Sequence, residues 1–463
     1  MVGGWSAPVA TQDRGTVPCG RGRATTAVVI GSLLSPAVEW LSGGRYPPRP
    51  GVSTTASMGP MDDVALRYLL LALRIGRHVP ELVGWYSGPP ELAEAVAGED
   101  PAPPAELHGE ALALADVVAE LPTDTPSRRR RATWLAGQLT ALSALARRAA
   151  GEEIDFVDLV EELNDVQVRP EPESAFDGAR AMVDAALPGS GALRDRLAAH
   201  DQRHRIPRER VIEVVSAVSA MLRARTHGQL WLPHGESVDF EAVTGVDGDA
   251  ETRYLGAGRS SIRINLDRSV TLADAVELAA HHAYPGHHAE AAIKDNVVVE
   301  AGGTELSLAA HLSPQSVISE GMASLAREVV MSDAELGFEL LRLARALRLR
   351  VDVEAELLVQ RARRLLAPAL GNAALALHMD GQPLIEVRTY LAEVALVGDD
   401  RLAATISLLT HPAWRAHAFT VIEGRRLVSE WLELEGQTHG FNRLLREQLS
   451  PAQLRIDIGQ RSA

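Results

Sequence analysis

Four of the fifteen histidines in this chain lie within eight consecutive positions, at the start of the segment His281–Glu290. The segment reads His-His-Ala-Tyr-Pro-Gly-His-His-Ala-Glu and follows an apolar stretch with helical periodicity. Imidazole is the most common protein ligand for zinc and related metals, and such a metal needs several ligands that converge from a short framework. The density of histidines therefore predicts the edge of a metal site.

The spacing in this cluster differs from the HExxH helix of many metallopeptidases. In that helix, two histidines one turn apart bind zinc, and the glutamate beside the first polarises the attacking water. Here Pro285 stands four residues after His281, and Pro-Gly breaks a regular helical turn. If Pro285 and Gly286 form a local bulge, His281 and His287 regain the one-turn relation and become two ligands. A tight turn that brings His288 inward instead is the alternative.

A third ligand should come from a nearby helix, and Glu320 is the best candidate. It interrupts the apolar and small-residue stretch Val317–Ala326, and a charged side chain is rarely buried unless it is paired or binds a metal. Two histidines, one carboxylate and one open water position form a catalytic zinc site. We therefore expect His281, His287 and Glu320 to bind Zn²⁺.

Helical periodicity dominates the chain from Asp62 onward, and the scarcity of aromatics (4%) favours helices packed through Leu, Val and Ala. The clearest strand is Ser260–Leu266, where polar and apolar residues alternate directly before the helix that carries the histidines. We predict one mainly helical domain over 58–463, with a small strand element near the metal site. Residues 1–57 are rich in Gly, Pro, Ser, Thr and Arg and are interpreted as a disordered or over-extended leader. Beyond the histidine segment, the helical patterns cover 288–299, 315–331, 333–368, 370–380, 383–396, 399–408 and 411–434.

Composition excludes several classes of protein. A net charge of −15 argues against non-specific binding of nucleic acid, which needs a basic surface. No stretch is long and apolar enough to cross a membrane, so a soluble cytoplasmic protein is expected. Cys19 is the only cysteine, which excludes an intramolecular disulfide and a thiolate metal cage.

The histidine segment and the Glu320 segment together resemble the domain of unknown function 885 family, which is grouped with the gluzincin-like metallopeptidases. The resemblance runs from about Met61 to Ile458 and rests mainly on Tyr-Pro-Gly-His-His-x-Glu and, about thirty residues later, Ile-Ser-Glu-Gly-x-Ala-x-Leu-Ala. It implies an all-α, thermolysin-related scaffold with a small sheet near the metal. It also implies that the strand Ile262–Leu266 borders the cleft, where an extended peptide could pair with it.

The chain departs from the family pattern at two places. The family has Glu directly after the first histidine, as the expected general base, whereas this chain has His282. The family also has tyrosines near the C-terminus that could stabilise an oxyanion, and the matching positions here are His417 and Val421. His282 could act as the base in place of the carboxylate, and His417 is a second catalytic candidate.

Two further charged residues are candidates for a role at the site. Glu277 lies one helical turn before His281 and could orient it, could replace the missing carboxylate, or could be an exposed helix residue. Arg415 could bind a substrate carboxylate or an oxyanion, or it could form a structural salt bridge.

These observations leave three functional hypotheses. The first is a zinc-dependent hydrolase, a peptidase or amidase acting on a peptide or small amide, with its catalysis impaired by His282. The second is a relative that binds metal or peptide without cleaving. The third is a helical interaction scaffold in which the histidines are structural. Of the three, we expect the zinc-dependent hydrolase.

Overall fold

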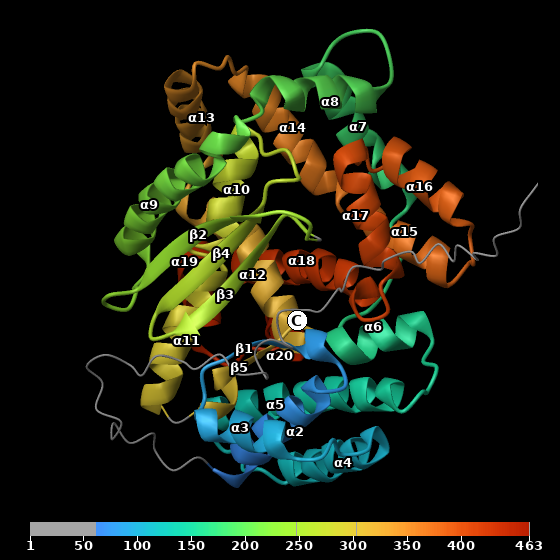
Figure 1. The fold of residues 1–463 in the computed structure, drawn as a ribbon, viewed down its shortest axis with the longest axis vertical. Coiled ribbons are helices and arrows are strands. Elements are labelled where there is room, and N and C mark those ends of the chain that lie inside the picture. Colours follow the sequence, from blue (N-terminus) through green and yellow to red (C-terminus); the bar gives the residue numbers. More distant parts are fainter. Residues whose placement is uncertain (1–61, 247, 302, 463) are drawn as a thin grey trace, which may run out of the picture.

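The computed structural model describes residues 62–246, 248–301 and 303–462, and this part of the chain is mainly helical with a few short strands (Figure 1). The predicted fold class is therefore confirmed, whereas the predicted leader, residues 1–57, lies outside the described residues. No helix in the described ranges combines the length and apolar character needed to cross a bilayer. The helices are α2 (Asp63–Gly76), α3 (Pro90–Gly98), α4 (Pro104–Ala119), α5 (Pro126–Ala149), α6 (Phe156–Asn164), α7 (Asp177–Ala186), α8 (Leu193–His204), α9 (Val211–Gln229), α10 (Leu272–His282), α11 (His287–Ala301), α12 (Pro314–Val330), α13 (Asp333–Leu347), α14 (Val353–Leu366), α15 (Ala369–His378), α16 (Leu384–Glu393), α17 (Asp399–Thr410), α18 (His417–Glu435), α19 (Gln437–Arg446) and α20 (Pro451–Ser462).

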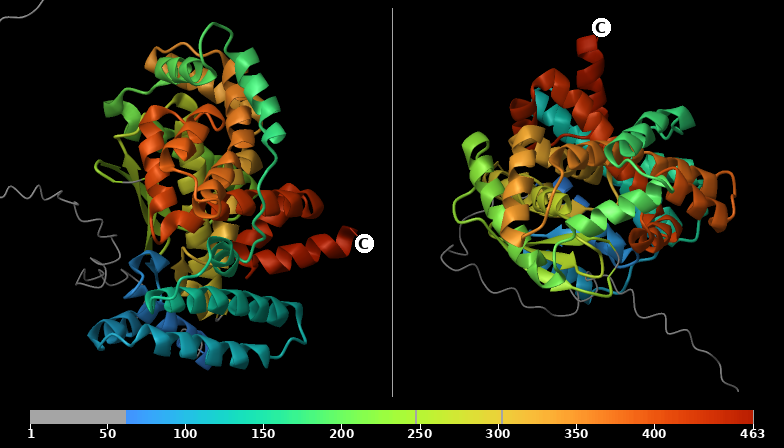
Figure 2. Two further views of the ribbon diagram at one scale, coloured as in Figure 1. Left: turned by 90° about the vertical axis from the view of Figure 1, so that its right-hand side faces the viewer. Right: turned by 90° about the horizontal axis from the view of Figure 1, so that it is seen from above.

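Helix α12 is the central helix of the fold. It contacts α5, α6, α10, α18, α19 and α20 (Figure 1). Most of its side chains are buried, and a helix of this kind is stable only when other elements surround it. Figure 2 shows the layer formed by α2 to α5 below this centre, and α20 running out to the edge of the molecule. Because α12 carries Glu320, its neighbours decide what that carboxylate can reach.

Helices α12 and α18 cross with almost no space between their backbones. A methyl group added at Gly321 would overlap the carbonyl oxygen of Gly424, and one added at Gly424 would overlap the carbonyl oxygen of Val317. Small residues at a crossing let two backbones approach closely. This contact places the first turn of α18, which begins at His417, beside the helix that carries Glu320.

A three-stranded sheet lies beside α10 and α11. It consists of β2 (Ser237–Val243), β4 (Arg259–Asn265) and β3 (Ala250–Gly256) in that order, with β2 parallel and β3 antiparallel to β4. A second, two-stranded sheet pairs β1 (Val83–Tyr86) with β5 (Leu308–Ala310).

The predicted strand corresponds to β4, and its residues Arg263 and Asn265 line a large cavity, so the strand borders the cleft as expected. The expected pairing of a peptide with this strand is wrong, because β4 is the central strand and is already paired on both sides. Among the described residues, β3 is the edge strand on the side of α10 and α11.

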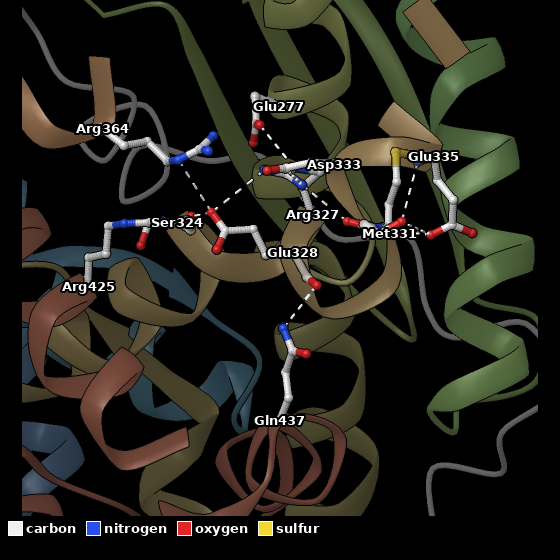
Figure 3. Close-up of polar contacts among 11 residues, drawn as sticks. Glu277, Ser324, Arg327, Glu328, Met331, Asp333, Glu335, Arg364, Arg425 and Gln437 are labelled. Atoms are coloured by element: carbon white, nitrogen blue, oxygen red, sulfur yellow. Dashed lines mark hydrogen bonds and ion pairs between the residues drawn. The ribbon is translucent and has the colours of Figure 1, made fainter. Parts of the chain in front are cut away.

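A buried arginine ties the end of α12 to α10, as Figure 3 shows. The Arg327 side chain is only 2% exposed, and its Nε donates to Glu277 Oε1 at 3.2 Å. Its Nη1 donates to Asp333 Oδ1 at 2.9 Å and to the carbonyl oxygen of Met331 at 3.1 Å. A guanidinium can make several such bonds at once because its donors form a rigid fork. The network fixes α10, which carries His281, relative to α12.

The long helix predicted over 333–368 is two helices in the structure. Helix α13 ends at Leu347, where Arg348 takes a left-handed conformation with φ of 55°. Helix α14 starts after Asp352, whose side chain accepts a hydrogen bond from the backbone of Ala355. The apolar periodicity continues across this break, so periodicity alone does not reveal it. The second helix packs with α7 and α8 around a separate apolar cluster.

We predict that Gly424→Ala lowers the free energy of unfolding by about 1–3 kcal/mol, because the added methyl group forces α18 away from α12. Urea denaturation would measure the change. The matched control is Gly109→Ala in α4, where nothing lies within 4 Å of an added Cβ. That variant should be neutral or more stable by up to about 1 kcal/mol, because alanine is the better helix former. Equal effects of the two substitutions would contradict the close approach.

Candidate metal centre

The chain reverses sharply between α10 and α11, at Pro285 and Gly286. The amide of Gly286 donates to the carbonyl oxygen of Ala280 at 3.0 Å. A methyl group at Gly286 would overlap the carbonyl oxygen of His281, so only glycine fits here. Helix α11 begins at the next residue, His287, directly against the end of α10. The local break that the sequence suggests is therefore present, and it returns the chain to His281.

The side chains of His281, His287 and Glu320 converge on one point. The two Nε2 atoms are 3.1 Å apart, Glu320 Oε2 lies 3.4 Å from His281 Nε2, and Glu320 Oε1 lies 3.5 Å from His287 Nε2. Metal–nitrogen and metal–oxygen distances of about 2.0–2.1 Å at tetrahedral angles require ligand atoms about 3.3 Å apart. The spacing and the donor types both fit a divalent metal. These three residues could hold a metal ion.

Electrostatics in this group favour ionised Glu320. Burial raises the pKa of its carboxyl, but the imidazoles of His287 and His281 together hold that pKa well below its usual range. Burial lowers the pKa of His287, but the carboxylates of Glu320 and Glu290 raise it to about 10. A metal ion that replaces the proton of His287 would be attracted by the same two carboxylates, Glu320 and Glu290.

A chain of buried polar groups supports the other face of His287. Ser319 Oγ lies 3.3 Å from His287 Nδ1 and donates a hydrogen bond to Glu290, which is paired with Lys294. A ligating histidine usually has its second ring nitrogen fixed in this way, which sets the orientation of the ring. Glu290 thus lies behind the ligand group, and it is 5% exposed.

The alternative ligand His288 points elsewhere. Its ring is fully buried, with Nδ1 at 2.8 Å from Ser260 Oγ and Nε2 at 3.0 Å from Glu236 Oε2. These contacts join α11 to the sheet and leave no ring nitrogen for a metal. Of the two histidines, His287 is the one that lies with His281 and Glu320.

His282 lies beside the metal-ligand group and is fixed by the edge strand. Its Nδ1 is 3.0 Å from Thr252 Oγ1, and the same hydroxyl donates to the His282 carbonyl oxygen at 3.2 Å. The Nδ1–H therefore donates to Thr252, and Nε2 carries no proton. Burial, with the neighbouring His281 and His287, lowers the pKa of His282 well below its usual value. The residue is a neutral hydrogen-bond acceptor where the family motif has a carboxylate.

Two further histidines line the same cavity as the metal-ligand group, and this cavity has a volume of about 850 Å³. His417 and His311 both line it, and Trp414 packs edge-on against both rings, with centroid distances of 5.5 and 5.7 Å. The Nδ1 atom of His417 is buried without a hydrogen-bond partner in the described part of the chain. Burial lowers the pKa of both imidazoles, that of His311 to about 4. Sequence reasoning missed His311, because it stands alone in the chain and reaches the cavity only through the pairing of β5 with β1.

The structure places two other candidates away from this group. The guanidinium of Arg415 lies over the ring of Phe156, 5.8 Å from its centroid, and Arg415 is not among the residues that line the cavity. The carboxylate of Glu277 pairs with Arg327, as described above. Neither contact supports a role at the metal-ligand group.

Comparisons with known proteins identify no family. No protein-family model and no curated protein matches the chain. Among solved structures, it is similar to a "putative lipoprotein" from Colwellia psychrerythraea, with 13% identity over 76% of this chain and 66% of that one and a TM-score of 0.48. A "putative lipoprotein of unknown function" from Shewanella oneidensis has 11% identity over 79% of this chain and 76% of that one, with a TM-score of 0.45.

We predict that Ser319→Ala weakens metal binding about tenfold, because His287 loses a hydrogen-bond partner that orients its ring. A competition titration with a chromophoric chelator would measure the affinity. Ser324→Ala is the matched control, since Ser324 lies on the same helix and bonds only the carbonyl oxygen of Gly321. Equal affinities of the two variants would contradict the orienting role of Ser319.

We also predict that His311 makes stability depend on pH between about 4 and 6.5. Its pKa is about 4 in the folded protein against 6.5 when unperturbed, so the unfolded chain binds more protons in this window. The free energy of unfolding should therefore rise as the pH increases from 4 to 6.5. Chemical denaturation across this range should show a shallower rise for His311→Gln, and an unchanged slope would contradict the prediction.

Proposed function

We propose that this protein is a zinc-dependent hydrolase of the peptidase or amidase type, with His281, His287 and Glu320 as the zinc ligands. One observation carries the proposal: the two Nε2 atoms lie 3.1 Å apart, and each has an oxygen of Glu320 within 3.4–3.5 Å, in the wall of a large cavity. Two imidazoles and one carboxylate are a common ligand set of catalytic zinc, with the fourth position left for water or substrate. A metal of this kind supplies a Lewis acid and lowers the pKa of a water molecule.

The resemblance to the domain of unknown function 885 family forms part of the same proposal. The Pro-Gly bulge, the adjacent His-His pair and the Glu-Gly pair on α12 are the residues that support it. The sharp turn at Gly286 and the close helix approach at Gly321 explain why glycine is needed at these two positions.

His282 takes the position of the general base in this proposal. Its unprotonated Nε2 can accept a proton from a water molecule, and Thr252 keeps the ring in place from the opposite side. A base is most effective when its pKa is near the working pH, whereas burial makes His282 a weak base. Slow turnover is therefore expected of a site with His282 as its base.

His417 and His311, which line the same cavity, are proposed to act on the substrate. A neutral imidazole can donate one N–H to an oxygen that gains negative charge, and such donors are most effective when they are fixed and shielded from water. His417 is suited to this because its buried Nδ1 has no partner among the described residues, and Trp414 holds its ring. This role replaces that of the family's tyrosines.

An extended peptide is the substrate that suits the cavity best. Strand β3 lines the cavity and is an edge of its sheet, so a substrate strand can be added at this edge. Thr252 on this strand also holds His282, which would bring a paired peptide next to the proposed base.

A second candidate function is binding of a metal or peptide without cleavage. The low basicity of His282 favours it, because the position after His281 then holds a weak base and no carboxylate. The two functions differ only in turnover, so one set of variants separates them.

The test measures zinc in protein purified without chelator. We expect His281→Ala/His287→Ala to contain about one zinc per chain less than the native protein. The surface pair His227→Ala/His439→Ala should lose none. No difference between the native and the His281/His287 variants, after reconstitution with zinc, would overturn the proposal.

A second variant tests catalysis. If the site is a hydrolase, His282→Glu should raise turnover of fluorogenic peptides by about 100-fold or more, the size of a typical general-base contribution. Zinc binding without turnover in either the native chain or His282→Glu would decide for the binding function.

A further inference from the structure

A second group of metal-binding side chains lies between α8 and α14. His200 and His204 are one turn apart on α8, and Glu356 lies in the first turn of α14. They are 2%, 4% and 1% exposed, respectively, and none of them lines the cavity described above. Charged or titratable side chains are rarely buried this deeply unless they are paired or bind a metal.

The donor atoms of this second group converge on one point. Glu356 Oε2 lies 2.7 Å from His200 Nε2 and 3.0 Å from His204 Nδ1, and the two ring nitrogens are 3.2 Å apart. Tetrahedral coordination by such ligands requires spacings of about 3.3 Å, so an ion would move the atoms apart by at most about 0.6 Å. The two rings stand at 86° to each other, which lets both point at the same place.

We propose that His200, His204 and Glu356 form a second metal site, which binds a divalent first-row metal such as Zn²⁺ and fastens α8 to α14. The N₂O donor set is suited to zinc and its neighbours, and a water molecule would complete the coordination. The site is independent of the proposed hydrolase site, because the two share no residue.

The neighbouring side chains of the site suit a bound cation. The other oxygen of Glu356 accepts a hydrogen bond from Gln360 Nε2 at 2.8 Å, so the carboxylate is fixed with one oxygen left for the metal. The nearby cation Arg363 is paired with Asp201 at 2.5 Å, which offsets its repulsion of a metal ion. Ligating carboxylates and histidines usually have such supporting bonds.

The site would stabilise a part of the fold with a small core of its own. Helices α7, α8 and α14 share an apolar cluster that is separate from the two larger clusters of the molecule. A cross-link between two of these helices adds the binding free energy of the metal to the stability of this region.

The test uses His281→Ala/His287→Ala as the starting protein, so that the first site is removed and the second is intact. Titration with Zn²⁺ against a chromophoric chelator should show about one bound ion per chain. Adding His204→Ala or Glu356→Gln should weaken this binding by more than about 100-fold, since even outer-shell changes cost up to that factor. Adding His227→Ala, an exposed histidine, should change nothing.

Thermal unfolding supplies a second measurement. Zinc should raise the Tm of the starting protein, and the rise should disappear when Glu356→Gln is added. Circular dichroism would establish that the starting protein is folded. If the folded protein bound no zinc, the proposal would be overturned, and the three residues would be a hydrogen-bonded His-Glu cluster. This outcome is distinct from failure of the hydrolase site. That failure would appear as equal zinc contents of the native protein and the starting variant.

Discussion

The contact between Gly286 and the last carbonyl groups of α10 is the constraint on which the candidate metal centre depends. A continuous helix through this region would place residue 285 where a second ligand is needed, and proline offers no ligand atom. Instead, the chain leaves the helix, turns against the carbonyl oxygens of Ala280 and His281, and starts α11 at His287. Any side chain at position 286 would separate the two helices and carry His287 away from His281. The spacing of the two ring nitrogens therefore follows from a backbone contact.

Helix α12 holds the rest of the site around this turn. Ser319 supports His287, Glu320 completes the donor group, and Gly321 admits α18 with His417 at its start. At the other end of the helix, Arg327 fixes α10 through Glu277. Because these contacts occur on one rigid element, a shift of α12 would disturb the donor spacing and the position of His417 together.

The cavity differs from a carboxylate-based hydrolase site in its supply of neutral imidazoles. Burial lowers the pKa of His282, His311 and His417, so each ring is uncharged at neutral pH. Uncharged rings do not compete with a divalent cation for Glu320, and they can still donate or accept one hydrogen bond each. In the function that we propose, this arrangement would favour metal binding more than rapid proton transfer.

Local sequence was sufficient for the fold class, the Pro-Gly break, the types of ligand and the isolated carboxylate on α12, because each is a property of neighbouring residues. Periodicity could not show the break between α13 and α14, since the apolar pattern runs through it. Only tertiary contacts decided that His287 and not His288 faces Glu320, because both follow the same turn and burial against the sheet takes His288. Tertiary contacts also decided that Glu277 pairs with Arg327 and that His311 lines the cavity. They likewise decided that β3 is an edge strand of its sheet and that β4 is the central strand. The meeting of His200 and His204 with Glu356 joins segments more than 150 residues apart, as the 2.7 Å contact across a separation of 156 residues shows. Such a meeting leaves no local signal, because it depends on how whole helices pack and not on the order of residues within one.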